Sequence, residues 1–196
     1  MPYSRAIGLL SKSVSRPTFY KVILPSRFIG GNTNEYLEYF CQAAEVPEVR
    51  MEAVAVRGHT DNGVTRGQPT LMVWGKPLRI DVIENSEFSV HQDFKRWMNR
   101  QASNANSETG SMKINYYDTV TGDIRLEKLE LGESVEIEDT GVFRAEDYRT
   151  VLTVTFINAY IKALGAVRLA SDATNQYTSF GAEFEYERYT TEYGQN

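Results

Sequence analysis

The sequence has very few of the residues on which metal binding, disulfide bonding and much of catalysis depend. Its 196 residues include one cysteine, Cys41, and two histidines, His59 and His91. A single cysteine excludes an intramolecular disulfide and a cysteine-based zinc finger. His59 and Asp61 share a short segment without the further ligands that a metal ion needs. We therefore expect no metal and no cofactor, and we predict that Cys41 is a small, buried strand residue.

Long apolar runs and phosphate-binding motifs are also missing. The apolar run near the start, Ala6 to Leu10, is too short for the core of a signal peptide, and nowhere does an apolar span reach the length of about 18 residues that a membrane helix needs. We expect a soluble protein made in a cytoplasm, with no membrane span. A Walker-type loop, Gly-x-Gly-x-x-Gly and Gly-x-Ser-x-Gly are all lacking. The sequence thus gives no basis for an enzyme.

The charge balance disfavours a protein that grips nucleic acid. The chain carries 26 acidic and 21 basic residues, a formal net charge of −5. Proteins that bind phosphate backbones tightly are usually basic, at least over the binding face. Specific DNA binding is therefore not expected.

What the sequence has in abundance is aromatic residues in strand-like patterns. There are 12 Tyr and 9 Phe, residues that suit a half-buried pleated surface. Apolar and polar residues alternate in several segments, which indicates strands. The predicted strands are 18–25, 35–47, 49–58, 70–75, 77–85, 112–118 with 123–131 as a hairpin, 149–160 and 178–190.

One segment has the spacing of a helix. Val90, Phe94 and Trp97 recur at i, i+4 and i+7, and Ser89 with Gln92 resembles a capping box. The pattern predicts an amphipathic helix over residues 86–102 that lies on a sheet. We expect one mostly antiparallel β-domain, residues 1–196. Its polar segments are an N-terminal arm (1–16), a loop (57–69), a second loop (102–111) and an acidic insertion (130–147).

The last predicted strand carries a row of carboxylates. In FGAEFEYERY, residues 180–189, one face has Phe180, Ala182, Phe184 and Tyr186, and the other has Glu183, Glu185 and Glu187. Paired carboxylates can serve a glycosidase, but here they alternate on one strand with no sign of a cleft. A catalytic pair is therefore disfavoured.

Four segments, in this order, resemble the tail tube proteins of T4-like contractile-tailed bacteriophages. They are SRPTFYKVILP (15–25), EYFCQAAEVPEV (38–49), IDVIENSEFSVHQDFKRWMNRQ (80–101) and INAYIKALGAVRLASDATNQYTSFGAEFEYERY (157–189). The ordered set carries the resemblance, which extends from about Ser15 to Tyr189. The sequence departs from the short form of the family at 102–111 and 130–147, which are longer.

The resemblance implies a β-sandwich or barrel with one flanking α-helix, and a structural role in the virion. Six copies would form a ring, and rings would stack into a tube inside a contractile sheath, with baseplate and tail terminator proteins as further partners. DNA would pass through the tube without specific binding. Assembly would take place in the host cytoplasm, and neither catalysis nor a cofactor is implied.

This expectation gives the polar residues candidate roles. An acidic lumen would repel DNA, whereas a basic wall would hold its phosphates. Candidates for the lumen are Glu183, Glu185, Glu187 and, secondarily, Glu52; alternatively they only face solvent outside the sandwich. Candidates for ring stacking are Arg5, Arg16, Arg57, His59, Asp61 and Arg66, or these segments are ordinary surface. Candidates for a sheath contact are Asp93, Lys95, Arg96 and Arg100.

Two other functions stay open at this point. The same fold would serve a type VI secretion system or a phage-like contractile particle, and the sequence separates these poorly from a phage. A small β-sandwich enzyme or carbohydrate-binding module is the alternative from another class. An exposed aromatic platform or turnover on a substrate would support it.

Overall fold

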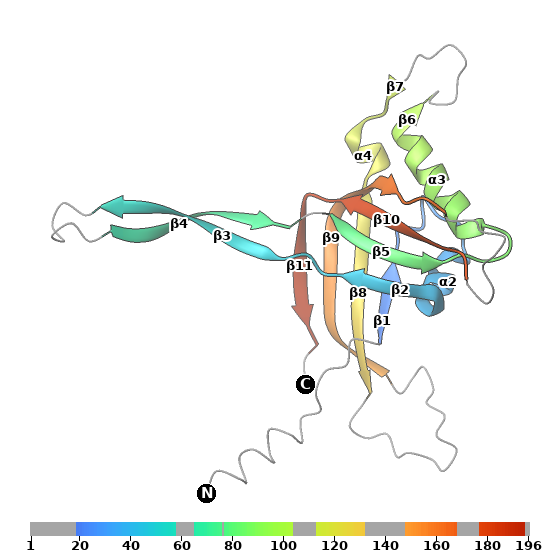
Figure 1. The fold of residues 1–196 in the computed structure, drawn as a ribbon, viewed down its shortest axis with the longest axis horizontal. Helices are drawn as coiled ribbons and strands as arrows, with labels where there is room; N and C mark the ends of the chain where they lie inside the picture. Colours follow the sequence, from blue (N-terminus) through green and yellow to red (C-terminus); the bar gives the residue numbers. More distant parts are fainter. Residues whose placement is uncertain are drawn as a thin grey trace, which may run out of the picture.

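A bent antiparallel sheet forms the centre of the structure, seen in the computed structural model of Figure 1. The structure describes residues 19–57, 65–75, 77–103, 113–131, 148–167 and 177–194. In space the strands follow the order β1 (Tyr20–Ile23), β8 (Gly122–Leu131), β9 (Tyr148–Leu164), β10 (Ser179–Glu185), β5 (Leu78–Ile83) and β2 (Cys41–Glu45), with β11 (Arg188–Tyr193) also paired to β9. Among the described residues, the sheet does not close into a barrel. The expected mainly β, antiparallel sandwich with a flanking helix is confirmed.

Strand β9 joins the two halves of this sheet. It lies between β8 on one edge and, on the other, β11 followed by β10. Asn158 lies between the stretches that pair with β11 and β10, and its φ of 55° places it in the left-handed region. In Figure 1, β8, β9 and β11 run along one direction, and β10, β5 and β2 cross it. The strand predicted over residues 178–190 is therefore two strands, broken at Tyr186 and Glu187.

The core lies between the half-sheets and beneath helix α3 (Ser89–Gln101), which occupies the range predicted to be helical. As the period of two predicts, Phe180 and Phe184 of β10 are buried. Phe94 of the helix meets both rings edge-on, with centroids 5.7 and 5.9 Å apart. Trp97 stacks on Phe28 at 4.8 Å. Each such aromatic side chain contributes about 1.5–3 kcal/mol through its burial.

The first turn of α3 is capped differently from the prediction. Ser89 does not occupy the cap position; Phe88 does, with φ 55°. The carboxylate of Glu84 accepts hydrogen bonds from the backbone N–H groups of Val90 (3.3 Å) and His91 (2.8 Å). The side-chain oxygen of Asn85 accepts one from the N–H of Ser89. The capping-box prediction is wrong because residues before the helix satisfy these donors.

Two predicted strand segments fold otherwise. Residues predicted as a strand over 35–47 begin as helix α2 (Thr33–Phe40), which turns Leu37 into the core before β2 starts at Cys41. The predicted hairpin of 112–118 with 123–131 does not form. Instead β7 (Lys113–Ile114) pairs with β6 (Ala102–Ser103), α4 (Tyr117–Val120) follows, and β8 pairs with β1 and β9.

A two-stranded arm projects from the body, at the left of Figure 1. It is formed by β3 (Val49–Arg57) and β4 (Thr65–Trp74), which form a sheet of their own. The predicted loop over 57–69 is therefore wrong at its ends, because Arg57 and Arg66 lie within paired strands. His59 and Asp61 lie outside the described residues.

Several other predicted segments also fall outside the described residues. These are the N-terminal arm with Arg5 and Arg16, most of the 102–111 loop and most of the 130–147 insertion. Among the described residues, none of the helices has the length and apolar character that a bilayer requires. Nor, within the described ranges, do three His, Cys, Asp or Glu side chains converge as they would around a metal ion.

Candidate functional site

The carboxylate row of β10 lies on the face of the sheet away from the core, but its charges are partnered. Glu183 pairs with Arg79 of β5, with Oε1 and Nε 2.9 Å apart. Glu185 pairs with Lys162 of β9, with Oε2 and Nζ 2.9 Å apart, and this contact raises the pKa of Lys162. Two of the three predicted carboxylates are therefore balanced by a neighbouring cation.

The third carboxylate holds the backbone turn between β10 and β11. Glu187 Oε2 accepts a hydrogen bond of 2.8 Å from the side-chain amide of Asn158, the left-handed residue of β9. The backbone N–H of Glu187 bonds to the carbonyl of Ile157. Glu187 thus stabilises the point at which β9 changes partner.

Together these residues form what we call the carboxylate face. With Asp81 of β5 and Glu45 of β2, which lies opposite Arg79, it holds five carboxylates and two cations, so its excess charge is about three negative units per chain (Glu183, Glu185, Glu187, Asp81, Glu45, Arg79 and Lys162). A mixed-charge surface repels a polyanion less strongly than a bare acidic strip. Glu52 is not part of it: that residue lies on the arm, 3.8 Å from Arg50.

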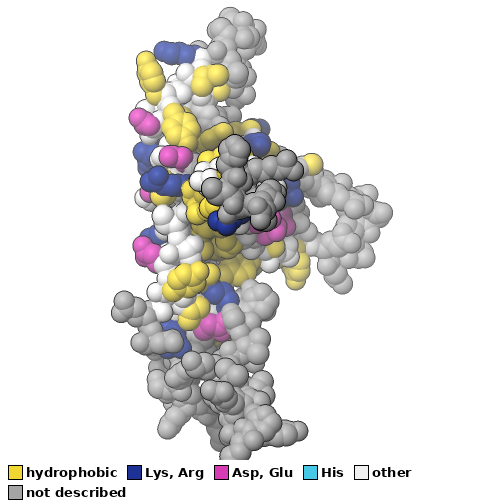
Figure 2. Space-filling model, turned by 90° about the vertical axis from the view of Figure 1, so that its left-hand side faces the viewer, with side chains coloured by type: hydrophobic (Ala, Val, Ile, Leu, Met, Phe, Trp, Pro, Cys, Tyr) yellow, Lys and Arg dark blue, Asp and Glu magenta, His cyan; other side chains and the backbone are white. Residues whose placement is uncertain are grey.

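The hairpin arm, β3 with β4, carries apolar side chains that face solvent on both of its faces. Met51 opposes Met72 on one face, and Leu71 opposes Glu52 on the other. The side chains of Met51, Val54 and Leu71 are 53%, 55% and 58% exposed, respectively. Figure 2 shows the molecule with the arm pointing toward the viewer, and apolar side chains surround the arm in this view. The same strands also hold Val49, Val56 and Met72 exposed.

Scattered apolar residues are normal on a protein surface, whereas a contiguous set on a projecting element indicates an interface. A two-stranded hairpin alone is also marginally stable in water. The arm therefore has the properties of an element that is covered by a partner.

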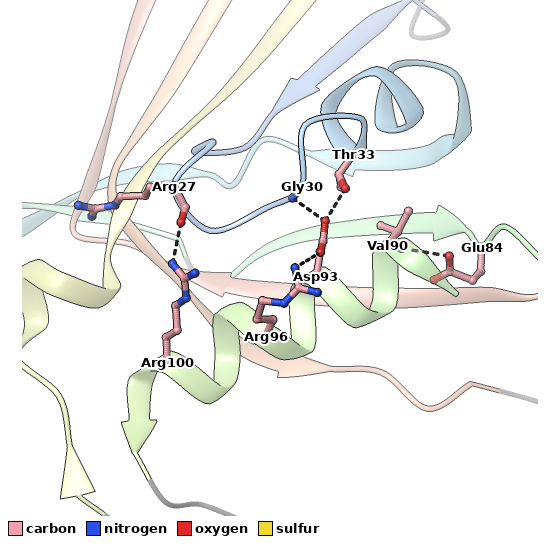
Figure 3. A network of polar contacts seen from close by, with 8 residues as sticks. All are labelled: Arg27, Gly30, Thr33, Glu84, Val90, Asp93, Arg96 and Arg100. Carbon is pink, nitrogen blue, oxygen red and sulfur yellow. Dashed lines mark hydrogen bonds and ion pairs between the residues drawn. The ribbon is translucent and has the colours of Figure 1, made fainter. Parts of the chain in front are cut away.

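Asp93, which the sequence predicts for the polar face of α3, is instead buried. Its Oδ2 accepts hydrogen bonds of 2.6 Å from both the N–H of Gly30 and the hydroxyl of Thr33, and Oδ1 pairs with Arg96 at 2.7 Å (Figure 3). Asp93 lies three residues after Val90 and four before Trp97, hence on the apolar stripe. It ties α3 to the loop before α2.

The cations of α3 remain at the surface. Lys95, Arg96 and Arg100 are exposed, and Arg100 donates a 2.7 Å hydrogen bond to the carbonyl of Arg27. Arg27 and Arg100 also lie near the face of the Phe28 ring. Lys95, Arg96 and Arg100 together make the outer face of α3 basic.

The remaining predicted residues have simple positions. Arg57 and Arg66 lie at the outer end of the arm, opposite Thr65 and Val56, respectively. Cys41 is half-buried at the start of β2, and burial raises the pKa of its thiol to about 11. His91 packs edge-on against Phe180 at 5.2 Å.

Sequence reasoning missed three parts of these surfaces: the cations that balance the carboxylates, the outward apolar residues of the arm and the burial of Asp93. The helical spacing of Asp93 was a usable signal. The apolar residues on both faces of 49–58 were another, because a strand with one solvated face shows a cleaner alternation.

Comparison with known proteins finds similarity to tube proteins of phage tails and contractile particles. A family model described as phage tail tube protein matches residues 14–192. A chain of the sheath–tube complex of the PVC extracellular contractile injection system, in its extended state, has a TM-score of 0.55 and 10% sequence identity, with coverage of 96% of this chain and 97% of that one. A chain of the tube-terminating cap of the anti-feeding prophage has a TM-score of 0.53 and 10% identity, with 93% of each chain covered. Comparison with curated protein sequences gave no match.

Proposed function

The chain belongs to the phage tail tube protein family, and from this premise we propose that six copies form a ring, with rings stacked into a tube that conducts DNA through a contractile tail. Family membership makes it a structural protein of a phage tail or a related contractile particle. The observation that carries the proposal is the hairpin arm with its exposed apolar residues.

The partner that covers the arm is a second copy of this chain. A tube is built by repeating one contact, in which a surface of one copy meets a different surface of the next. Such contacts close into rings or continue along an axis, depending on the rotation between copies. An arm that extends beyond its own body suits this geometry, because its apolar side chains reach past the protomer that carries them.

The carboxylate face is the proposed lining of the lumen. Its excess of carboxylates would keep DNA phosphates from binding, since tight phosphate binding requires a basic surface. The ion pairs of Arg79 and Lys162 moderate the repulsion, which leaves a weakly acidic wall. Glu52 would then lie at an interface between copies and not at the lumen.

The other candidate contacts follow from position. Lys95, Arg96 and Arg100 on α3 are proposed to meet the sheath, and charged contacts of this kind are modest enough to release on contraction. Arg57 and Arg66 at the end of the arm are proposed for stacking, with Arg5, Arg16, His59 and Asp61 as further candidates. The baseplate and terminator would contact the two ends of the tube.

The test is assembly of the purified protein with and without its arm contacts. Met51→Lys with Leu71→Lys places a charge on each face of the arm. Tyr39→Lys, at a residue that is 77% exposed on α2, is the matched control. Assembly is scored by electron microscopy as each protein is concentrated, alone and with tail baseplates as templates.

We expect hollow tubes with sixfold end views from the wild type and the control, and single protomers from the arm variant. A map of the tube would show whether the carboxylate face lines the channel. A stable closed dimer of the wild type, or normal tubes from the arm variant, would contradict the proposal.

A second candidate is the tube of a contractile injection particle that has no capsid. The fold likeness to chains of the PVC and anti-feeding prophage particles favours it. Capsid and portal genes beside the gene for this chain would favour the phage, and their absence the particle.

A further inference from the structure

The direction of the hairpin arm is decided at two short connections. β3 and β4 pair with each other and with no other strand in the described part of the chain. The chain enters the arm through Pro47 and Glu48, and leaves it through Gly75. Since strand pairing does not join the arm to the body, contacts at these connections must hold its angle.

A tyrosine hydroxyl from the body holds each connection. The hydroxyl of Tyr186 donates to the carbonyl oxygen of Gly75, at the exit from the arm. The hydroxyl of Tyr189 donates to the carbonyl oxygen of Pro47, at the entry, over 2.8 Å. The two connections are also joined to one another, because the N–H of Gly75 donates to the carbonyl of Glu48 at 2.7 Å.

These two tyrosines are themselves held in place by the core. Tyr186 is only 1% exposed and lies at the break between β10 and β11. The rings of Phe156, Tyr186 and Tyr189 pack against one another, with centroid distances of 5.0 Å (Phe156–Tyr186), 5.5 Å (Phe156–Tyr189) and 6.2 Å (Tyr186–Tyr189). Because Phe156 belongs to the long strand β9, the hydroxyls are fixed relative to the whole sheet.

Gly75 has a steric reason to be glycine at this point. A Cβ there would lie 2.9 Å from the carbonyl oxygen of Glu48 and 3.1 Å from its Cγ. The close approach of the two connections therefore leaves no space for a side chain. The two connections at the base of the arm are therefore tightly packed against each other.

We propose that Tyr186 and Tyr189 are positioning residues for assembly: they fix the angle of the arm in the free protomer, so that it meets a neighbouring copy without first being ordered. This inference rests on the proposed function, in which the arm docks on a second copy. A binding element that is already in its bound geometry loses less conformational entropy on association.

The test is the double variant Tyr186→Phe with Tyr189→Phe, which removes the two hydroxyls and keeps both rings. Tyr20→Phe is the matched control, because the hydroxyl of Tyr20 also donates to a backbone carbonyl, that of Cys41, at 2.8 Å. That bond lies within the body and not at the arm. Urea unfolding checks that all variants are folded.

The first measurement is the arm angle in the free protomer, at a concentration below that of assembly. Spin labels at Val54→Cys and Lys95→Cys, in a Cys41→Ala background, report the distance between arm and helix. We expect one narrow distance distribution for the starting protein and for Tyr20→Phe, and a broad one for the double variant. An unchanged distribution in the double variant would overturn the inference and leave the proposed function intact.

The second measurement is the critical concentration for tubes, without labels. Each hydrogen bond contributes roughly 1 kcal/mol, and 1.4 kcal/mol corresponds to a factor of ten. We expect the double variant to need about a tenfold or greater increase in concentration, and Tyr20→Phe little change. A broadened distance with an unchanged critical concentration would also overturn the inference. Absence of tubes from the wild type under every condition would instead contradict the proposed function.

Discussion

Replacing Asp93 with alanine is expected to destabilise the protomer strongly, although the sequence places Asp93 on the polar face of its helix. The carboxylate accepts three hydrogen bonds, from Gly30, Thr33 and Arg96, at 2.6, 2.6 and 2.7 Å. Hydrogen bonds to a charged group contribute about 1.5–3 kcal/mol each, and an unsatisfied buried donor costs about 1–3 kcal/mol. Half of the Arg96 side chain is exposed, so its share is no more than about 1 kcal/mol.

The two buried hydrogen bonds alone, at the lower end of this range, predict a loss of at least about 3 kcal/mol in the free energy of unfolding for Asp93→Ala. Arg96→Ala removes only the exposed partner and is expected to cost less than about 1 kcal/mol. Asp93→Asn keeps the shape and one acceptor oxygen, and an intermediate value is expected. Urea unfolding of the unassembled protein, followed by tryptophan fluorescence, measures all three, since Trp97 lies one turn further along α3.

The reasoning would be refuted if Asp93→Ala and Arg96→Ala cost the same within about 0.5 kcal/mol. That result would mean that the loop before α2 does not depend on the carboxylate. Weakened sheath binding with unchanged stability would instead restore Asp93 as a surface contact.

Three further predictions concern the body of the protomer. Trp97→Phe removes the 2.9 Å hydrogen bond from Nε1 to the carbonyl of Val120, and a loss of about 2 kcal/mol is expected in urea unfolding. Gly122→Ala places a Cβ 2.8 Å from Cγ of Pro25, and overpacking of this kind is expected to cost about 1–3 kcal/mol, measured as a lower melting temperature. Burial raises the pKa of Tyr186 to about 12 from its ordinary 10.0. The contribution of this shift to stability is complete below about pH 10 and is lost as the pH rises toward 12. In an unfolding series at alkaline pH, the free energy of unfolding of Tyr186→Phe should therefore fall less steeply with pH than that of the wild type.

The strand pattern of the sequence was informative where one face of a strand is buried. Phe180, Ala182 and Phe184 alternate with outward residues in β10, as their spacing predicts. The pattern could not predict that the strand breaks at Tyr186, because Phe156 and Tyr189 surround that ring in the core. The break is a property of packing between strands distant in sequence.

Helix α2 was missed because its aromatic residues favour a strand locally. Tyr36 and Phe40 stack at 4.3 Å, a contact that needs the i, i+4 geometry of a helix. Leu37 between them is fully buried. Tertiary packing therefore overrides strand propensity here.

The predicted hairpin across Gly122 failed for a similar reason. Gly122 is the first residue of β8 and not part of a turn, and a Cβ there would lie 2.8 Å from Cγ of Pro25 and 3.1 Å from Cε2 of Phe28. The partners of β8 are β1 and β9, which local reasoning cannot identify.

The surfaces were predicted in part. Alternation placed Glu183 and Glu185 together, yet it could not reveal Arg79 and Lys162, since those cations come from two other strands. The family resemblance rested on the order of four segments. The family could therefore be predicted without knowing which strands pair with each other.

The place of β9 in the sheet has a consequence for synthesis of the protein. Before residue 179 has been made, β5 can pair only with β2, and β9 only with β8, so strand pairing leaves the sheet in two pieces. β10 joins them, and β11 then completes β9. A chain interrupted before β10 would expose the open edges of both pieces and would invite aggregation. Its arm would also lack Tyr186 and Tyr189, whose hydroxyls bond to the two connections at its base.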